Sequence, residues 1–394
     1  MGQRVNIMDN PKKSILHVLV RLDYGGIETW LVNVLRNYNR QKFQMDVCLV
    51  GRRGEIGILG KQAEAAGSLL FVVSLRNPFL FIRKFKQLAA NYEAVLVHTD
   101  ISITSFILFA ALLGGVKHRL FMLHNTKFTI PIRTLRGNQS GILLYLGKVV
   151  FKFLNRILAT GILGCSMTVL DQNYPGWREH HLAEVLYLGI DLERFMGVVN
   201  INQLRESLGI PKDALVVGHI GRFYRQKNHY HFICVAKYLS AIDPNIHFLL
   251  VGDGPLRPEI ETQIKNVDLQ KRFHLTGIRD DIPELMKIMD IAYFPSLHEG
   301  FPITFIEAQV SGLVLVTIAR PEMCEAVCPK NHQWCVVEDY KIENSGDSIF
   351  YLLSNPDLRS QLAIHAQMWA IEKFSIKKST LSLEDILIRN LEGI

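Results

Sequence analysis

The 394-residue chain contains few cysteines and no long apolar run. Its six cysteines are scattered, which does not suggest a disulfide framework and favours a reducing, cytoplasmic environment. The longest apolar stretch, residues 101–116, contains Ser and Thr and is shorter than the ~20 residues that span a bilayer, so we expect a buried helix there. The first 20 residues show no apolar run followed by a small-residue cleavage site, so no signal peptide is expected.

Acidic residues are missing from a long segment of the first half. None occurs between Asp100 and Asp171. Residues 1–200 contain 24 Lys and Arg against 13 Asp and Glu, a net charge of +11, whereas residues 201–394 contain 20 against 24, a net charge of −4. This one-sided charge implies that the first half meets an anionic partner, such as a membrane, a nucleic acid or a phosphorylated substrate. No interleaved aromatic platform or nucleic-acid-binding motif is present, so we do not expect a nucleic acid partner.

Low-complexity segments and short repeats are also lacking, and the chain instead shows two series of short apolar runs separated by helical patterns. The predicted strands are residues 14–20, 43–50, 69–74, 94–99, 118–124 and 161–166, and then 214–220, 246–252, 272–277, 291–296 and 313–318. Two successive βαβ series predict an α/β fold with two doubly wound, Rossmann-like domains.

The predicted domains are residues 1–195 and 196–372, followed by a helix within 373–394 that could pack back across the joint. Ligands of doubly wound sheets bind at the carboxyl ends of the strands. We therefore expect the binding site in the cleft between two facing domains.

Two of the predicted strands are followed by loops suited to phosphate. The first loop, "YGGIET", has Gly25 and Gly26 before a helix, where the backbone can approach an anion closely. It is not GxGxxG, so a nicotinamide or flavin fingerprint is absent, and an ordinary turn is the alternative. The second loop, "GRFYRQKNH", has Arg222 and Lys227, which could converge on a diphosphate or could belong to a solvated basic loop.

A third motif, "LHEGFPITFIEA", places two carboxylates after the strand at 291–296. Pro302 suits the first position of a helix, which puts Glu299 in the loop and Glu307 within the helix. Carboxylates accept hydrogen bonds from vicinal hydroxyls, as acidic residues do with ribose in nucleotide folds. The three motifs together predict a ligand with both phosphates and polyols, a nucleotide sugar. The alternative is a helix whose glutamates only complement the helix dipole.

The chain resembles the family 4 retaining glycosyltransferases of the GT-B fold along nearly its whole length. The resemblance is carried by "GRFYRQKNH", "VGDGPLRPEIE", "YLGIDLERF" and the two glutamates in "HEGFPITFIE", and "LDYGGIETWLVNVLR" is similar to the bacterial capsule and exopolysaccharide branch. It implies transfer of a hexose or N-acetylhexosamine from a nucleoside diphosphate donor, with UDP the expected nucleotide. The acceptor would be a lipid-linked or growing saccharide. A nucleotide-sugar 2-epimerase and a non-catalytic partner of a polysaccharide assembly complex are the alternatives.

The resemblance also implies which residues bind the nucleotide part of the donor. Glu307 would hold the ribose, and Arg222 and Lys227 would hold the diphosphate. Gly26 would come near the phosphates, and the loop around Ile278 would lie against the base.

For the transferred sugar, the resemblance implies Glu299 together with the backbone at Gly300, Phe301 and Pro302. His124 in "LHNT" lies where the family has a histidine near the sugar, so Glu299 and His124 are the candidate catalytic residues. His98 in "VHTD" is a second candidate histidine. Either histidine could instead be structural.

No cofactor is expected. The sequence has no DxD-like carboxylate pair for a metal, and an Arg–Lys pair can take the place of a divalent ion, so the prediction is metal independence. The loop after residues 313–318 departs from the family's glycine-rich pattern and contains Cys324, Cys328, His332 and Cys335. Their spacing matches no standard zinc finger. Buried thiols are the alternative to a zinc site.

Lys148, Lys152 and Arg156 recur every fourth residue in an otherwise apolar helical pattern. Such a stripe is typical of a helix that lies on an anionic membrane surface. The alternative is an ordinary domain helix with a solvated face. The prediction is a cytoplasmic protein that is peripheral on the inner face of the cell membrane.

Overall fold

The structure is a computed structural model that describes residues 12–23, 25–51, 55–126, 139–179 and 182–393, with side chains outside 139–148. Its contacts divide the chain into two compact units. The first unit comprises residues 1–165, 169–189 and 376–394, and the second comprises 166–168 and 190–375. The chain passes from the first unit to the second after Gly189, whereas the sequence analysis expected the domain boundary at residue 195. The last helix, α17 (Ile376–Glu392), belongs to the first unit.

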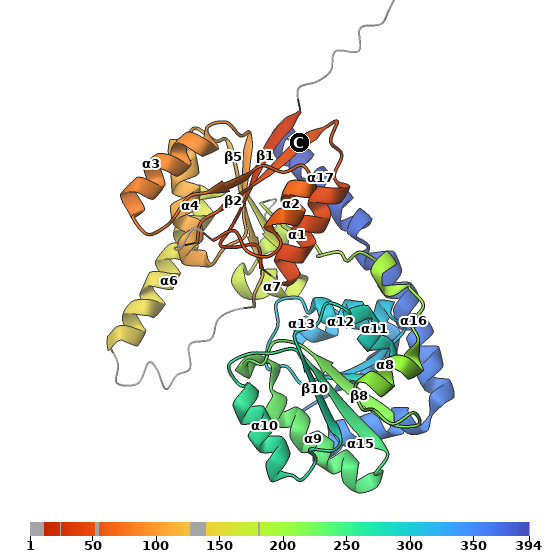
Figure 1. The fold of residues 1–394 in the computed structure, drawn as a ribbon. Coiled ribbons are helices and arrows are strands. Elements are labelled where there is room, and N and C mark those ends of the chain that lie inside the picture. Colours follow the sequence, from red (N-terminus) through yellow and green to blue (C-terminus); the bar gives the residue numbers. More distant parts are fainter. Residues whose placement is uncertain (1–11, 24, 52–54, 127–138, 180–181, 394) are drawn as a thin grey trace, which may run out of the picture. The chain divides into compact units, whose positions relative to one another are not determined.

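In the described part of the first unit, seven parallel strands form a sheet in the order β3-β2-β1-β4-β5-β6-β7. Figure 1 shows β1, β2 and β5 between helices α3 and α4 on one side and α1 and α2 on the other. The strands are β1 (Lys13–Leu19), β2 (Phe43–Leu49), β3 (Leu70–Val72), β4 (Ala94–Val97), β5 (His118–Leu123), β6 (Gly161–Gly164) and β7 (Ala183–Val185). Between them the chain forms α1 (Gly26–Asn37), α2 (Gly60–Ala65), α3 (Pro78–Ala89), α4 (Ile101–Leu113), α6 (Gln139–Leu158) and α7 (Met167–Asn173). Helices α1, α2 and α17 pack together, as do α3, α4 and α6.

In the described part of the second unit, six parallel strands form a sheet in the order β10-β9-β8-β11-β12-β13. The strands are β8 (Leu215–Ile220), β9 (Ile246–Val251), β10 (Phe273–Gly277), β11 (Ile291–Phe294), β12 (Val314–Ile318) and β13 (Val336–Val337). The longer helices are α8 (Ile201–Ser207), α9 (His229–Ile242), α10 (Arg257–Asn266), α11 (Ile282–Lys287), α12 (Ile303–Val310), α15 (Ile342–Ser354) and α16 (Pro356–Phe374).

The predicted doubly wound architecture is confirmed for both units, because each sheet is parallel and reverses its strand order once. The reversals lie between β1 and β4 and between β8 and β11, the places where such folds bind ligands. Each predicted strand is present, whereas β7 and β13 are additional. These two strands have three and two residues, too few to produce a recognisable apolar run.

Helix α17 is held to the first unit by polar contacts as well as by apolar packing. The indole N–H of Trp30 in α1 donates to the hydroxyl of Ser379 (2.8 Å), which donates to the carbonyl of Tyr187 (2.7 Å). The backbone N–H of Asn39 donates to the Glu384 carboxylate at 2.6 Å. The end of the chain is therefore an integral part of the first unit.

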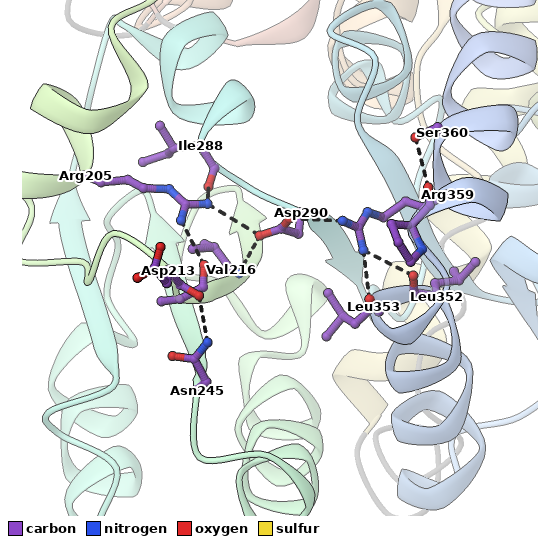
Figure 2. Close-up of polar contacts among 12 residues, drawn as sticks. Arg205, Asp213, Val216, Asn245, Ile288, Asp290, Leu352, Leu353, Arg359 and Ser360 are labelled. Carbon is purple, nitrogen blue, oxygen red and sulfur yellow. Dashed lines mark hydrogen bonds and ion pairs between the residues drawn. The ribbon is translucent and has the colours of Figure 1, made fainter.

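A charged network ties together the amino ends of β8 and β11 in the second unit. Figure 2 shows the Asp290 carboxylate between the guanidinium groups of Arg205 and Arg359, at 3.5 and 3.3 Å. Asp290 also accepts the backbone N–H of Val216 in β8 (2.9 Å). The two arginines donate further to backbone carbonyls, namely those of Lys212, Ala214, Ile288, Leu352 and Leu353. The network joins α8, both strands and α15–α16.

Candidate active site

The candidate donor site of the second unit is built from two loops at the carboxyl ends of β8 and β11. The backbone N–H of Leu297 donates to the Gln226 carbonyl (2.8 Å), and the side-chain amide of Asn228 donates to the Pro295 carbonyl (3.2 Å). Asn228 adopts the left-handed conformation (φ 54°), which asparagine tolerates, and α9 begins directly after it. These contacts join the "GRFYRQKNH" loop to the "LHEGFP" loop at the switch point of the sheet.

An ion pair between Lys227 and Glu299 lies where the two loops meet. The Lys227 Nζ is 2.7 Å from Glu299 Oε1, and the Gln226 amide donates to Glu299 Oε2 at 3.1 Å. The two charged side chains are only 17% and 8% exposed. A Cβ at Gly221 would come within 3.3 Å of the Lys227 side chain, so this glycine leaves room for it. Because an ammonium carries three N–H donors, Lys227 can hold Glu299 and an anionic ligand together.

Two residues that the sequence analysis did not single out complete this group. Gln226 directly precedes Lys227 in the same motif. Glu322, which is buried, accepts the backbone N–H of Glu299 at 3.5 Å from the short helix α13 (Pro321–Cys324). Gln226 could have been predicted from the sequence, because it lies in the loop that already contained Arg222 and Lys227 as candidate site residues. For Glu322 the sequence offered only one indication, namely that the residue follows the strand predicted at residues 313–318.

The backbone of residues 300–302 is buried beside Glu299, and the ring of Phe301 packs 5.4 Å from that of Phe374. The prediction for Pro302 needs a correction. Helix α12 begins at Ile303, one residue later than expected, because the ψ angle of Pro302 is 91° and therefore extended. Pro302 caps the helix instead of opening it.

Glu307 lies in the middle of α12 and is half-buried. Burial raises the pKa of its carboxyl to about 7, and the positive charge of Arg194 partly opposes that rise. Arg194 belongs to the short 3₁₀ helix Glu193–Phe195 and lines an open depression of about 380 Å³ with Asp280, Asp281, Pro283 and Glu284. A partly buried carboxyl of this kind suits a neutral diol better than a second anion.

The other predicted donor residues are Arg222, Ile278 and Gly26. Arg222 is exposed, and its guanidinium lies 5.5 Å from the centre of the Tyr224 ring. Ile278 is 76% exposed, directly after β10. Gly26 is the first residue of α1 in the first unit, after the capping residue Gly25. The structure thus brings together the loops of Lys227 and Glu299; Arg222 shares the loop of Lys227, whereas Ile278 follows β10 and Gly26 begins α1.

The candidate histidines of the first unit form a chain across three neighbouring strands. His124 follows β5, His98 follows β4, and His17 lies within β1. Ring nitrogens approach each other at 3.3 Å between His124 and His98 and at 3.1 Å between His98 and His17. Burial lowers the pKa of His17 and His124 to about 3 and that of His98 well below its usual value. All three rings are therefore neutral at physiological pH. The sequence analysis did not select His17, since its only distinguishing feature in the sequence is that it is a histidine inside an apolar strand.

Comparison with known proteins identifies the family. Residues 200–369 match the family described as glycosyl transferases group 1. The putative glycosyltransferase EpsF of Bacillus subtilis is 31% identical over 312 residues, which cover 78% of this chain and 79% of EpsF. The chain is a group 1 glycosyltransferase. The predicted membership of family 4 is thereby confirmed, as is the prediction of an enzyme that transfers sugars.

Two further proteins resemble this glycosyltransferase over much of its length. The UDP-Gal:alpha-D-GlcNAc-diphosphoundecaprenol alpha-1,3-galactosyltransferase of Escherichia coli is 28% identical over 281 residues, covering 68% of this chain and 70% of the relative. The Anabaena protein HepE, solved in complex with UDP, superposes with a TM-score of 0.78 at 20% identity and covers 95% of this chain and 99% of its own. The predicted GT-B fold is confirmed.

The cysteine-containing loop of the glycosyltransferase shows no metal-binding arrangement. The His332 Nε2 lies 3.0 and 3.1 Å from the carbonyl oxygens of Cys324 and Val327, so this nitrogen carries a proton that both accept. Cys328 and Cys335 are buried, and the Cys328 thiol contacts the His365 carbonyl at 3.7 Å. In the part of the chain that the structure describes, no group of three or more His, Cys, Asp or Glu side chains could hold a metal ion.

The basic stripe on α6 lies partly against its own unit. Lys152 donates to the Asn173 side chain (3.2 Å), and the Arg156 guanidinium lies 5.1 Å from the centre of the Tyr174 ring. The side chain of Lys148 is outside the described residues. The outward face of α6 is instead apolar, with partly or largely exposed side chains at Val149, Val150, Phe153, Leu154 and Ile157.

The expectation of a buried helix over residues 101–116 was correct only in part. Helix α4 buries one side, but Phe106, Phe109, Leu112 and Leu113 are each more than 40% exposed. Helix α4 packs against α6, so both helices contribute exposed apolar side chains to the same part of the first unit. Among the described helices, none is both long and apolar enough to cross a membrane.

Proposed function

We propose that the enzyme transfers a hexose or N-acetylhexosamine from a UDP-linked donor to a lipid-linked saccharide in exopolysaccharide or capsule formation, with retention of anomeric configuration. The observation that carries the proposal is the joining of the Lys227 and Glu299 loops at the switch point of the second sheet. The printed name of the Escherichia coli relative supports a UDP-linked donor and a diphosphoundecaprenol-linked acceptor. The UDP complex of HepE supports UDP as the nucleotide.

The proposed division of roles follows from charge. Lys227 and Arg222 bind the diphosphate, and the cationic Lys227 stabilises the negative charge that develops on it as the donor bond breaks. Glu299, which Lys227 and Gln226 hold in place, accepts hydrogen bonds from hydroxyls of the transferred sugar. Glu307 accepts hydrogen bonds from the ribose diol. By the family resemblance, His124 acts at the transferred sugar.

The proposed reaction needs no covalent intermediate. The bond between the anomeric carbon and the leaving phosphate oxygen breaks, and the bond to the acceptor oxygen forms on the same face of the sugar. The proton of the acceptor hydroxyl passes to the departing phosphate. Because Lys227 and Arg222 supply the positive charge, we propose that no divalent metal is required.

A transfer assay with a panel of nucleotide sugars and a diphosphoundecaprenol-linked saccharide tests the proposal. We expect acceptor-dependent release of UDP, a product with retained configuration by proton NMR, and unchanged turnover in EDTA. Conversion of the donor to a 2-epimer without acceptor would favour the epimerase. Nucleotide binding without turnover of any donor would favour a non-catalytic partner, and activity that EDTA abolishes and magnesium restores would refute metal independence.

We also propose that α6 and α4 place the enzyme on an anionic membrane surface, where a lipid-linked acceptor would be found. Phe153 and Ile157 on α6 are 63% and 61% exposed. Exposure of apolar side chains to water is unfavourable, and insertion of these side chains into the interfacial region of a membrane would remove that cost. The segment between Asp100 and Asp171 has no acidic residue, so anionic headgroups would meet no opposing charge from it. Apolar side chains, more than the basic stripe, would make the contact.

Flotation with vesicles of anionic or of neutral lipid tests the membrane contact. We expect the enzyme to float with anionic vesicles, and Phe153→Ser and Ile157→Ser to weaken that binding. Met368→Ser is the matched control, because this side chain is 67% exposed on α16 of the second unit. Equal flotation of all variants, or no flotation of the wild type, would contradict this contact.

A further inference from the structure

His17, His98 and His124 lie at the switch point of the first unit's sheet. Strands β4, β1 and β5 contribute one ring each, and β4 lies between the other two. The rings are stacked, with centres 5.4 Å apart between His17 and His98 and again between His98 and His124. His98 uses its Nε2 toward His17 and its Nδ1 toward His124. The central ring is therefore bonded at both nitrogens.

This geometry couples the protonation sites of the three rings. A neutral imidazole has one N–H and one bare nitrogen, and each nitrogen-to-nitrogen hydrogen bond needs one of each. Two arrangements satisfy both contacts. In one, all three rings carry the proton on Nδ1; in the other, all three carry it on Nε2.

The two outer rings of this row of histidines, His17 and His124, distinguish the two arrangements. The Nε2 of His17 and the Nδ1 of His124 are buried and have no hydrogen-bond partner among the described residues. Each arrangement leaves one of these two nitrogens as an N–H without a partner: the Nδ1 arrangement leaves it at His124, and the Nε2 arrangement leaves it at His17. His17 is fully buried inside the sheet, whereas the His124 residue is partly exposed, so a ligand could supply the missing acceptor only at His124. This difference favours the arrangement with all protons on Nδ1.

Neither a metal site nor a proton-conducting path fits these contacts as well. A three-histidine metal site needs one nitrogen from each ring to converge on the ion, whereas His98 directs its two nitrogens to different partners. A path would need an exit beyond the Nε2 of His17, which has no partner among the described residues.

We infer that His98 and His17 are positioning residues that hold His124 in the neutral Nδ1–H tautomer, so that its Nδ1–H donates a hydrogen bond to an oxygen of the substrate. The role at the substrate rests on the proposed function, whereas the tautomer follows from the contacts within the first unit. His17 lies entirely inside the sheet and acts through His98. The tautomer of a histidine is commonly set in this way by the partner of its other nitrogen.

Nitrogen NMR of the free protein, labelled with ¹⁵N-histidine and assigned with single variants, tests the tautomer directly. We expect Nδ1–H signals from His17, His98 and His124. His17→Leu removes the donor to His98 and is expected to give His124 mixed or Nε2–H signals. His17→Asn, whose amide reaches as far as Nδ1, is expected to keep the wild-type pattern. A wild-type spectrum with His98 protonated at Nε2 would overturn the inference.

Transfer kinetics test the positioning role. We expect His17→Leu to lower kcat by about tenfold with the donor KM unchanged, and His17→Asn to restore most of the loss. Ile15→Val controls for core packing, since Ile15 is fully buried on the same face of β1. Equal kcat for the Leu and Asn variants at matched Tm would also overturn the inference. If no nucleotide sugar supports transfer, the proposed function fails, but the spectra of the free protein still decide the tautomer.

Discussion

The second unit carries two charged clusters at opposite ends of the same two strands. At the amino ends of β8 and β11, Asp290 pairs with Arg205 and Arg359, and the guanidinium groups continue to backbone carbonyls (Figure 2). At the carboxyl ends, Lys227 pairs with Glu299, and burial raises the pKa of Glu307 in the helix that follows the Glu299 loop.

The difference lies in how completely the charges are satisfied by the protein itself. The arginines of the first cluster are bonded mainly to backbone carbonyls of three segments, residues 212–214, residue 288 and residues 352–353, an arrangement that stabilises the unit. Lys227 retains N–H capacity beyond its bond to Glu299, and Glu307 holds a carboxyl that burial disfavours in its charged form. Charged groups with unused bonding capacity at a switch point are suited to a ligand.

The largest expected loss of stability comes from Asp290→Ala. The change leaves two partly buried guanidinium groups without their carboxylate and removes the acceptor of the Val216 N–H, so we expect a loss of about 3 kcal/mol in unfolding free energy. Glu261→Ala, which breaks an exposed pair with Arg257, should cost less than about 1 kcal/mol. Urea denaturation measures both. The kcat/KM of folded Asp290→Ala should match the wild type, and a large loss there would contradict the structural role.

At the other end of the strands, Lys227→Met should act mainly on catalysis. We expect kcat/KM for the donor to fall by roughly 100- to 1,000-fold, as when a group that stabilises transition-state charge is removed. Steady-state transfer assays measure the loss. Adding Glu299→Gln should recover stability, because it removes the unpaired buried carboxylate, without recovering activity. Restored activity in the double variant would show that Lys227 only neutralises Glu299.

The raised pKa of Glu307 predicts a pH-dependent stability. Between pH 4.5 and 7 the folded state keeps a proton that the unfolded chain releases, so this residue's contribution to stability falls as the pH rises through that window. Glu307→Gln lacks this titration and should gain roughly 3 kcal/mol on the wild type between pH 4 and pH 8. Urea denaturation at a series of pH values measures the difference. A constant difference across the range would contradict the raised pKa.

The smallest expected effect concerns the ribose. If Glu307 accepts hydrogen bonds from the diol, the wild type should bind UDP about tenfold more tightly than 2′-deoxy-UDP, since one lost hydrogen bond to a carboxylate is worth that much. Glu307→Ala should bind the two nucleotides nearly equally, as measured by calorimetry. Discrimination that persists in the variant would place the diol elsewhere.

Residues within one motif were predictable because they are neighbours in the chain. The Lys227 and Glu299 loops each follow an apolar run, and the carboxyl ends of neighbouring parallel strands meet at one edge. Their direct ion pair was not predicted, since the separate roles of phosphate and sugar binding gave no reason for contact. Glu322 was not predicted either, because its loop departs from the family pattern.

The sequence by itself determined the two doubly wound units, the loops of the candidate donor site and the family, because apolar periodicity and turn residues are local properties that the chain displays directly. Only the tertiary structure decided that His17, His98 and His124 form one chain, since the residues in contact are separated by 81 and 26 positions and meet through the order β1-β4-β5. It also decided that α6 turns apolar side chains outward. Which side of a helix is covered depends on what packs against it, and no local pattern contains that information.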